Sequence, residues 1–150
     1  MGLDMYLHAE LFLYFNTDLD KKVNDAIKNM DIAGIGDMKV KRIQCESIYW
    51  RKANAIHQWF VDNVQEGNDD CGHYHVELDQ LKELASLCRK ALADKSNAEK
   101  ILSPQPGFFF GSTEIDEYYF QDLEHTASSI ENILDRPGIE HWDFKYHSSW

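Results

Sequence analysis

Aromatic, basic and amide side chains gather in one stretch of the sequence, residues 47–63, SIYWRKANAIHQWFVDN. Read as a helix, it buries an apolar face and carries Arg51, Asn54 and Gln58 along a neighbouring face, with His57 at the border. Guanidinium, ammonium and amide donors neutralise an anion, and indole rings stack on planar groups. The stretch therefore predicts contacts to an anionic ligand, made by Trp50, Arg51, Lys52, Asn54, His57 and Trp59.

A second cluster lies in the block GFFFGSTEIDEYYF, at residues 107–120. Its tyrosine rings could stack on a base, and together with the basic stretch it would complete a site for a nucleotide or another small anion. Its predicted contributors are Glu114, Asp116, Tyr118 and Tyr119. The same charges could equally form ion pairs between two helices, and the sequence leaves that alternative open.

A third group of residues could hold a metal ion. In a strand, Cys71, His73 and His75 would share one face, and imidazole with thiolate suits zinc. Asp69 and Asp70 precede them and could add carboxylate ligands. The run C-x-H-x-H lacks the paired spacing of a structural zinc site, so surface histidines beside an acidic turn are the competing interpretation. No other pattern indicates a cofactor.

The composition limits the classes of function. Among 150 residues, 26 are acidic and 15 are basic, which gives a formal net charge of -11. This charge repels phosphate backbones, so we do not expect non-specific nucleic-acid binding. The sequence also contains no G-x-S-x-G elbow, no H-E-x-x-H pair and no P-loop. We therefore expect binding rather than catalysis.

The cysteines and the hydropathy indicate a compartment. Three cysteines, an odd number without a C-x-x-C pair, are typical of reduced thiols rather than of a disulfide framework. No apolar run approaches the roughly 18 residues that a membrane span needs. We therefore expect a cytoplasmic protein that makes no contact with membranes.

The length predicts one domain over residues 1–150, since a chain of this size typically buries roughly 68 to 70% of its unfolded surface. The periodicity of apolar residues predicts its elements. Strands are predicted over residues 3–15, 38–49, 71–78, 107–111 and 139–150. Helices are predicted over residues 19–30, 50–67 and 79–93 and between Thr113 and Arg136. This order favours an α+β (or α/β) domain with a central sheet of about five strands and about four helices. The polar composition of residues 94–105 predicts a flexible loop.

The predicted helix over residues 19–30 has a marked apolar face. Thr17 or Asp18 can cap its first turn. Its apolar residues fall at helical spacing, and we expect this face to be buried: Val23, Ala26, Ile27 and Met30.

Three blocks, YWRKANAIHQWF, the DDCG turn at residues 69–72 and GFFFGSTEIDEYYF, together resemble a family of small uncharacterised proteins encoded by bacteriophages and prophages. The similarity runs over most of the chain, from MGLDMYL to the terminal SSW. It implies a cytoplasmic phage product that acts inside a bacterium, but no particular activity. His73 and His75 depart from the family pattern, so chemistry built on them would not be a family property.

We therefore expect a non-catalytic binding protein, most concretely a counter-defence protein that captures a nucleotide-derived signal. Two alternatives stay open. One is a metal-dependent phosphoester hydrolase that uses Asp69, Asp70, His73 and His75. The other is an acidic interaction protein that blocks a basic host factor. The expected partners are a small anionic ligand or a host protein, and the chain could form a homo-oligomer.

Overall fold

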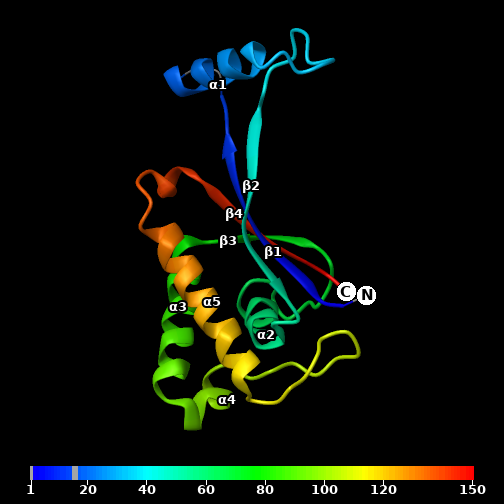
Figure 1. Ribbon diagram of the computed structural model, residues 1–150, viewed down its shortest axis with the longest axis vertical. Helices are drawn as coiled ribbons and strands as arrows, with labels where there is room; N and C mark the ends of the chain where they lie inside the picture. The colour runs from blue at the N-terminus through cyan, green and yellow to red at the C-terminus, as the bar shows by residue number, and fades with distance from the viewer. Residues whose placement is uncertain (1, 15–16) are drawn as a thin grey trace.

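The computed structural model describes residues 2–14 and 17–150. Its described residues form one four-stranded antiparallel sheet with the strand order β2-β1-β4-β3 (Figure 1). The strands are β1 (Asp4–Phe12), β2 (Arg42–Arg51), β3 (His73–Val76) and β4 (Asp143–Ser149). The helices are α1 (Asp18–Asn29), α2 (Asn54–Asn63), α3 (Leu78–Ala93), α4 (Ala98–Ile101) and α5 (Glu117–Leu134), with short 3-10 turns at Lys95–Asn97 and Ile139–His141. The predicted α+β class is confirmed, with slightly different element counts.

Alternation along the strands separates a buried face of the sheet from an open one. In β1, Met5 and Leu7 are fully buried, whereas Tyr6 and His8 are half-exposed. Side chains on opposite faces alternate with a period of two, so this pattern sets the register of the sheet. The buried face packs on α2, α3 and α5, and Phe60 of α2 stacks on Tyr146 of β4 with ring centroids 3.9 Å apart.

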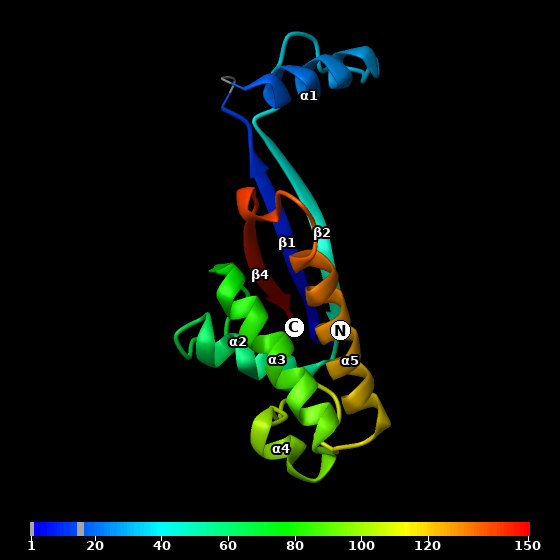
Figure 2. The same cartoon turned by 90° about the vertical axis from the view of Figure 1, so that its left-hand side faces the viewer.

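Helices α3 and α5 lie side by side under the sheet (Figures 1 and 2). Their apolar faces are largely those predicted, with Leu84, Cys88, Leu123 and Ile130 fully buried. On the solvent side, Arg89 of α3 donates hydrogen bonds to two carboxylates of α5, Glu124 and Glu131, at 2.6 to 2.8 Å. The packed apolar faces and the hydrogen bonds of the Arg89 guanidinium hold the two helices together as one layer.

The sheet narrows to two strands at one end. Strand β1 pairs with β4 only as far as Glu10, whereas its pairing with β2 continues to Phe12. This two-stranded neck projects from the body, and α1 lies across its tip (Figure 1). Thr17, one of the two predicted caps, is the N-cap of α1 and forms a capping box with Asp20.

The expected burial of the apolar face of α1 is wrong. Met30 is 65% exposed, Ala26 is exposed, and Val23 and Ile27 are only half-buried. The reason is the projection of the neck, since α1 makes no extensive contact with another described helix or strand. Helical periodicity identified the face correctly, but the described chain covers it only in part.

Three further expectations about local structure are corrected. The helix expected from Trp50 begins only at Asn54, because β2 remains paired with β1 as far as Arg51. The GFFFG segment is a turn rather than a strand, and Phe108 is 95% exposed. Residues 94–105 include helix α4 rather than forming only a loop, because Ala98 and Leu102 are buried against the core.

Among residues 2–14 and 17–150, no helix combines the length and the hydropathy that crossing a bilayer requires.

Candidate functional site

A pocket of about 360 Å³ opens where the end of β2, the first turn of α2, the turn at residues 107–112 and the start of α5 meet. Residues from both sequence clusters line it, although they are about 60 residues apart in the chain. Those predicted as ligand contacts are Arg51, Lys52, Asn54, Glu114, Asp116, Tyr118 and Tyr119. The tertiary structure therefore brings the two predicted halves of the site together.

The junction between β2 and α2 has an unusual backbone. Lys52 has a positive φ of 59°, a left-handed conformation that side chains other than glycine adopt at a cost. Its N–H donates to the Leu3 carbonyl at 2.8 Å, which holds the junction against β1. Gly111, at φ +87°, lies beside it, and a Cβ there would come within 3.3 Å of Lys52 Cβ. Strained backbone of this kind is often retained where it positions a functional side chain.

Arg51 and Lys52 provide positive charge at the α2 side of the pocket, whereas the carboxylates of Glu114, Asp116 and Asp122 line its α5 side. Both side chains are exposed, and neither forms an ion pair with any residue that the structure describes. The N-terminus of α2 adds to this charge, because its first turn contains no acidic residue and no side chain caps it. Ala55 and Ile56, in that first turn, line the pocket. An uncapped helix start beside two free cations favours an anion.

Asn54 has a structural role, so its predicted contact with the ligand is wrong. Its side-chain amide donates to the carbonyls of Phe110 and Ser112, at 3.0 and 2.7 Å, and the residue is 4% exposed. These bonds tie the turn at residues 107–112 to the start of α2. Asn54 therefore builds the wall of the pocket instead of donating into it.

The two adjacent tyrosines have different roles. Tyr118 is 75% exposed at the rim, so its ring is free to stack on a planar group. Tyr119 is buried, and its hydroxyl donates to the Leu102 carbonyl at 2.7 Å and the Ala98 carbonyl at 3.2 Å. The prediction that Tyr119 stacks on a ligand is therefore wrong, because its ring anchors α5 to α4.

Three carboxylates line the pocket, and sequence analysis missed one of them. Asp116 caps α5, accepting the Tyr119 N–H at 3.0 Å, and Glu114 is exposed at the rim. Asp122 is half-buried, and burial raises its pKa to about 6. It lies four residues after Tyr118, so the helical repeat places both on one side of α5. That spacing was the signal that could have identified it.

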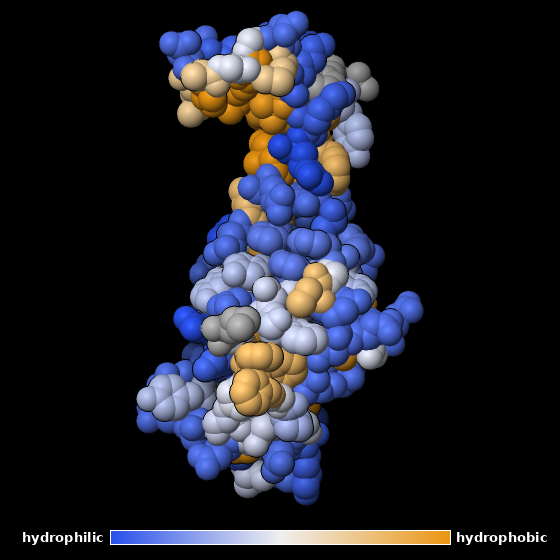
Figure 3. Space-filling model, turned by 90° about the vertical axis from the view of Figure 1, so that its right-hand side faces the viewer, coloured by the Kyte–Doolittle hydropathy of each residue, from blue (hydrophilic) through white to orange (hydrophobic). Residues whose placement is uncertain are grey.

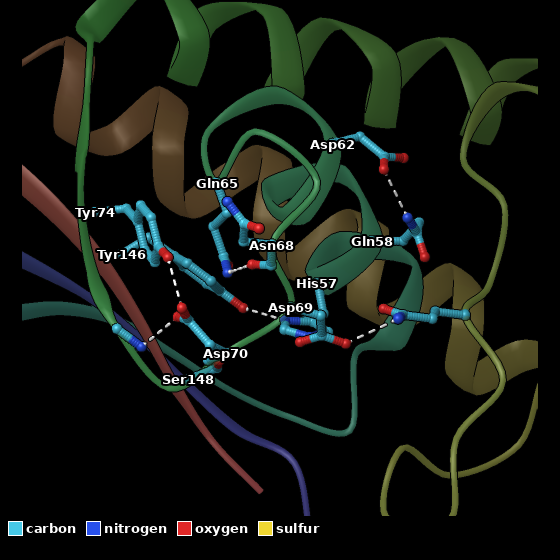
Figure 4. A network of polar contacts seen from close by, with 12 residues as sticks. His57, Gln58, Asp62, Gln65, Asn68, Asp69, Asp70, Tyr74, Tyr146 and Ser148 are labelled. Atoms are coloured by element: carbon cyan, nitrogen blue, oxygen red, sulfur yellow. Dashed lines mark hydrogen bonds and ion pairs between the residues drawn. The ribbon is translucent and has the colours of Figure 1, made fainter.

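His57 is sealed in the core, so its predicted contact with an anion is wrong. Its side chain is fully buried between Tyr146, with Nδ1 2.6 Å from the hydroxyl oxygen, and Asp69, with Nε2 2.9 Å from Oδ1 (Figure 4). Burial lowers the pKa of His57, although the Asp69 carboxylate partly opposes the shift. The neutral ring then accepts from Tyr146 and donates to Asp69.

The two tryptophans proposed for stacking are also core residues. Trp50 is 2% exposed, and its indole N–H donates to the Thr126 hydroxyl of α5 at 2.8 Å. Trp59 is 5% exposed and packs edge-on against Phe60. Neither indole lines the pocket. The stacking predictions for both are wrong, because β2 and α2 turn these rings toward α5 and the core.

The acidic turn predicted as a metal site uses its carboxylates for hydrogen bonds. Besides accepting from His57, Asp69 accepts from the Gln105 side chain at 2.9 Å. Asp70 accepts the Gly72 N–H at 2.7 Å and the Tyr74 hydroxyl at 2.9 Å. These bonds fold the turn back on itself and onto α2.

The other predicted metal ligands also have separate neighbours. His73 stacks on His147 with ring centroids 4.1 Å apart, and His75 lies 3.1 Å from a carboxylate oxygen of Glu77. Cys71 is an exposed free thiol. Within the described part of the chain, no three His, Cys, Asp or Glu side chains are grouped to hold a metal ion. The structure therefore does not assemble Asp69, Asp70, Cys71, His73 and His75 into one ligand set.

The chain matches no protein-family model, no curated protein and no solved structure. The resemblance to phage proteins stays a prediction.

Proposed function

We propose that the pocket between α2 and α5 binds a small nucleotide-derived anion and that the protein retains this ligand without transforming it. The observation that carries the proposal is the position of two unpaired cations, Arg51 and Lys52, beside the uncapped N-terminus of α2. In a chain of net charge -11, these two cations favour an anionic group at the α2 side of the pocket, while the three carboxylates of the lining lie on the α5 side.

The chemistry of the pocket changes from one side to the other. The phosphate would lie at the α2 side, where the backbone amides and the guanidinium can donate to it. The base would stack on the exposed ring of Tyr118, and the half-buried Asp122 carboxylate would accept hydrogen bonds from ribose hydroxyls. The volume of about 360 Å³ lies in the range of pockets that hold small molecules.

Retention fits this pocket better than turnover. Among the described residues lining it, none is a histidine or a cysteine, and Asp116 is engaged as a helix cap. For a phage product, as the sequence resemblance implies, retention of a nucleotide signal would deprive a host defence of its trigger. The protein would thus act in counter-defence, by capturing a nucleotide-derived signal of the host.

Calorimetric titration with adenosine, guanosine and uridine 5′-monophosphates and with a cyclic dinucleotide tests the proposal. Arg51→Met keeps the aliphatic stem but removes the charge, and we expect affinity to fall about 10- to 100-fold. Arg136→Met is the matched control, because Arg136 is also exposed but lies outside the pocket. Tyr118→Ala should weaken binding about tenfold or more, whereas Tyr14→Ala, with a ring 72% exposed at the neck, should not.

The fate of the ligand separates retention from catalysis. Heat denaturation of the complex should release the added nucleotide chemically unchanged, as measured by mass spectrometry. Absence of binding by every nucleotide in the panel, or binding that Arg51→Met leaves unaltered, would overturn the proposal. A converted nucleotide would overturn retention and favour a hydrolase.

A further inference from the structure

Exposed apolar side chains gather on one side of the tip and neck. We define the head as residues 17–41, which contain α1 and the turn after it, and the neck as residues 11–14 and 42–43. Ten large hydrophobic side chains are exposed in the described chain, and six of them lie in the head and neck: Phe12, Tyr14, Leu19, Met30, Ile32 and Met38. Figure 3 shows hydrophobic side chains gathered on the underside of the head and along the neck, above a mostly polar body.

The head has no core of its own. Between Leu13 and Ile48, no described hydrophobic residue is buried. Helix α1 has 12 residues, and isolated helices of that length are marginal in water, because most helical stability comes from packing of the apolar face. The segment at Val40 holds α1 through Asn24 and leaves Val23 and Ile27 only half-buried, so the amphipathic helix needs more partner surface than the described chain supplies.

The distribution of charge favours a second copy of the chain as the partner. The head contains five aspartates and five lysines, so its formal charge is zero and the remainder of the chain carries the whole -11. Two copies that met through their bodies would bring like charges together, whereas two heads meet without net repulsion and the necks keep the acidic bodies apart. A surface of zero formal charge with an exposed apolar side can therefore pack on a second copy of itself at the end of an acidic molecule.

We propose that the head is a dimerisation surface and that a second copy of the head covers it. The two α1 helices pack through the faces that contain Leu19, Val23, Ile27 and Met30, about a two-fold axis. A 12-residue helix is only about 18 Å long, and a stable interface buries about 800 Å² on each partner. The turn after α1 and the neck therefore contribute as well, through Phe12, Ile32 and Met38.

Sedimentation equilibrium of the full chain over about 1 to 500 µM tests the proposal, with an expected limiting mass of twice the chain mass. Leu19→Gln combined with Met30→Gln keeps charge and helix propensity, and each change counts twice across a two-fold interface. We expect the dissociation constant to rise at least about 100-fold. Phe108→Gln removes a side chain of the body that is 95% exposed, more than Leu19 at 51% or Met30 at 65%, and should leave the constant unchanged.

Amide hydrogen exchange locates the interface, whatever the variants do to folding. Protection of α1 should rise with protein concentration, whereas protection of α3 and α5 should not. A monomer at every concentration, or a dimer weakened by Phe108→Gln but not by the head variant, would overturn the proposal. A different protein bound stoichiometrically to the head of a monomer would overturn it too.

Discussion

Nε2 of His57 lies 2.9 Å from Oδ1 of Asp69, and this contact ties the middle of α2 to the acidic turn before β3. The histidine is fully buried, whereas the Asp69 side chain is 24% exposed. Because Asp69 also accepts from Gln105, its carboxylate joins α2 and the segment at Gln105 to the turn before β3. The pair supports the fold near the pocket without lining it.

The pair predicts a loss of stability in mild acid. Burial lowers the pKa of His57 below 6.5, so the folded chain binds fewer protons than the unfolded chain. The contribution of His57 is therefore complete above about pH 6.5 and declines as pH falls toward the folded pKa, by up to about 1.4 kcal/mol per pH unit. Urea unfolding of the native chain and of the His57→Gln variant, at about pH 7.5 and pH 5.5, measures this decline.

At the higher pH, His57→Gln should lower the free energy of unfolding by about 1 to 3 kcal/mol, because buried partners lose a hydrogen bond. At the lower pH the difference between the two proteins should narrow. His75→Gln is the control, since His75 is exposed at the end of the sheet. A difference that widens in acid would show instead that the Asp69 carboxylate holds a protonated His57.

Asp122 should show the opposite dependence on pH. Because burial raises its pKa to about 6 from 3.8, the ionised carboxylate destabilises the folded chain above that pH, and protonation removes the penalty. Asp122→Asn should raise the free energy of unfolding at about pH 7.5 by about 1 to 2 kcal/mol, allowing for partial solvent exposure. The gain should vanish toward pH 4. Glu83→Gln, on the exposed side of α3, should give no comparable gain, and an equal gain there would contradict the assignment.

The left-handed backbone of Lys52 predicts a difference between two small substitutions. Lys52→Ala and Lys52→Gly both remove the charge, but only glycine adopts a φ of 59° without strain. We expect the glycine variant to be about 1 kcal/mol more stable than the alanine variant in thermal unfolding. Both should bind adenosine 5′-monophosphate more weakly than the native chain. Equal stability of the two variants would mean that the junction relaxes to negative φ.

The thiols should divide into two classes. Cys88 is fully buried on α3, and burial raises its pKa to about 12, so little thiolate forms at neutral pH. Cys45 and Cys71 are exposed. Titration with an aromatic disulfide reagent should modify two thiols quickly and the third only after unfolding, with peptide mass spectrometry assigning each. Rapid modification of Cys88 would show that α3 opens readily from α5.

Local sequence patterns determined most of the secondary structure, because they follow from periodicities of two and 3.6 that need no knowledge of neighbours. The buried faces of α3 and α5 and the alternation of Phe144 and Tyr146 in β4 are examples. Residue chemistry also identified Arg51 and Tyr118 as candidate ligand contacts, and the fold then placed both at one pocket.

Only the tertiary structure decided which of these side chains are accessible. Pairing of Trp50 and Arg51 with β1 extends β2 to the residue before the Lys52 junction, and this turns Trp50 and His57 inward while Arg51 stays outside. The exposed face of α1 has the same origin. Periodicity identifies residues that share a face, but burial depends on what other part of the chain covers that face, and this is a long-range property that local sequence does not contain.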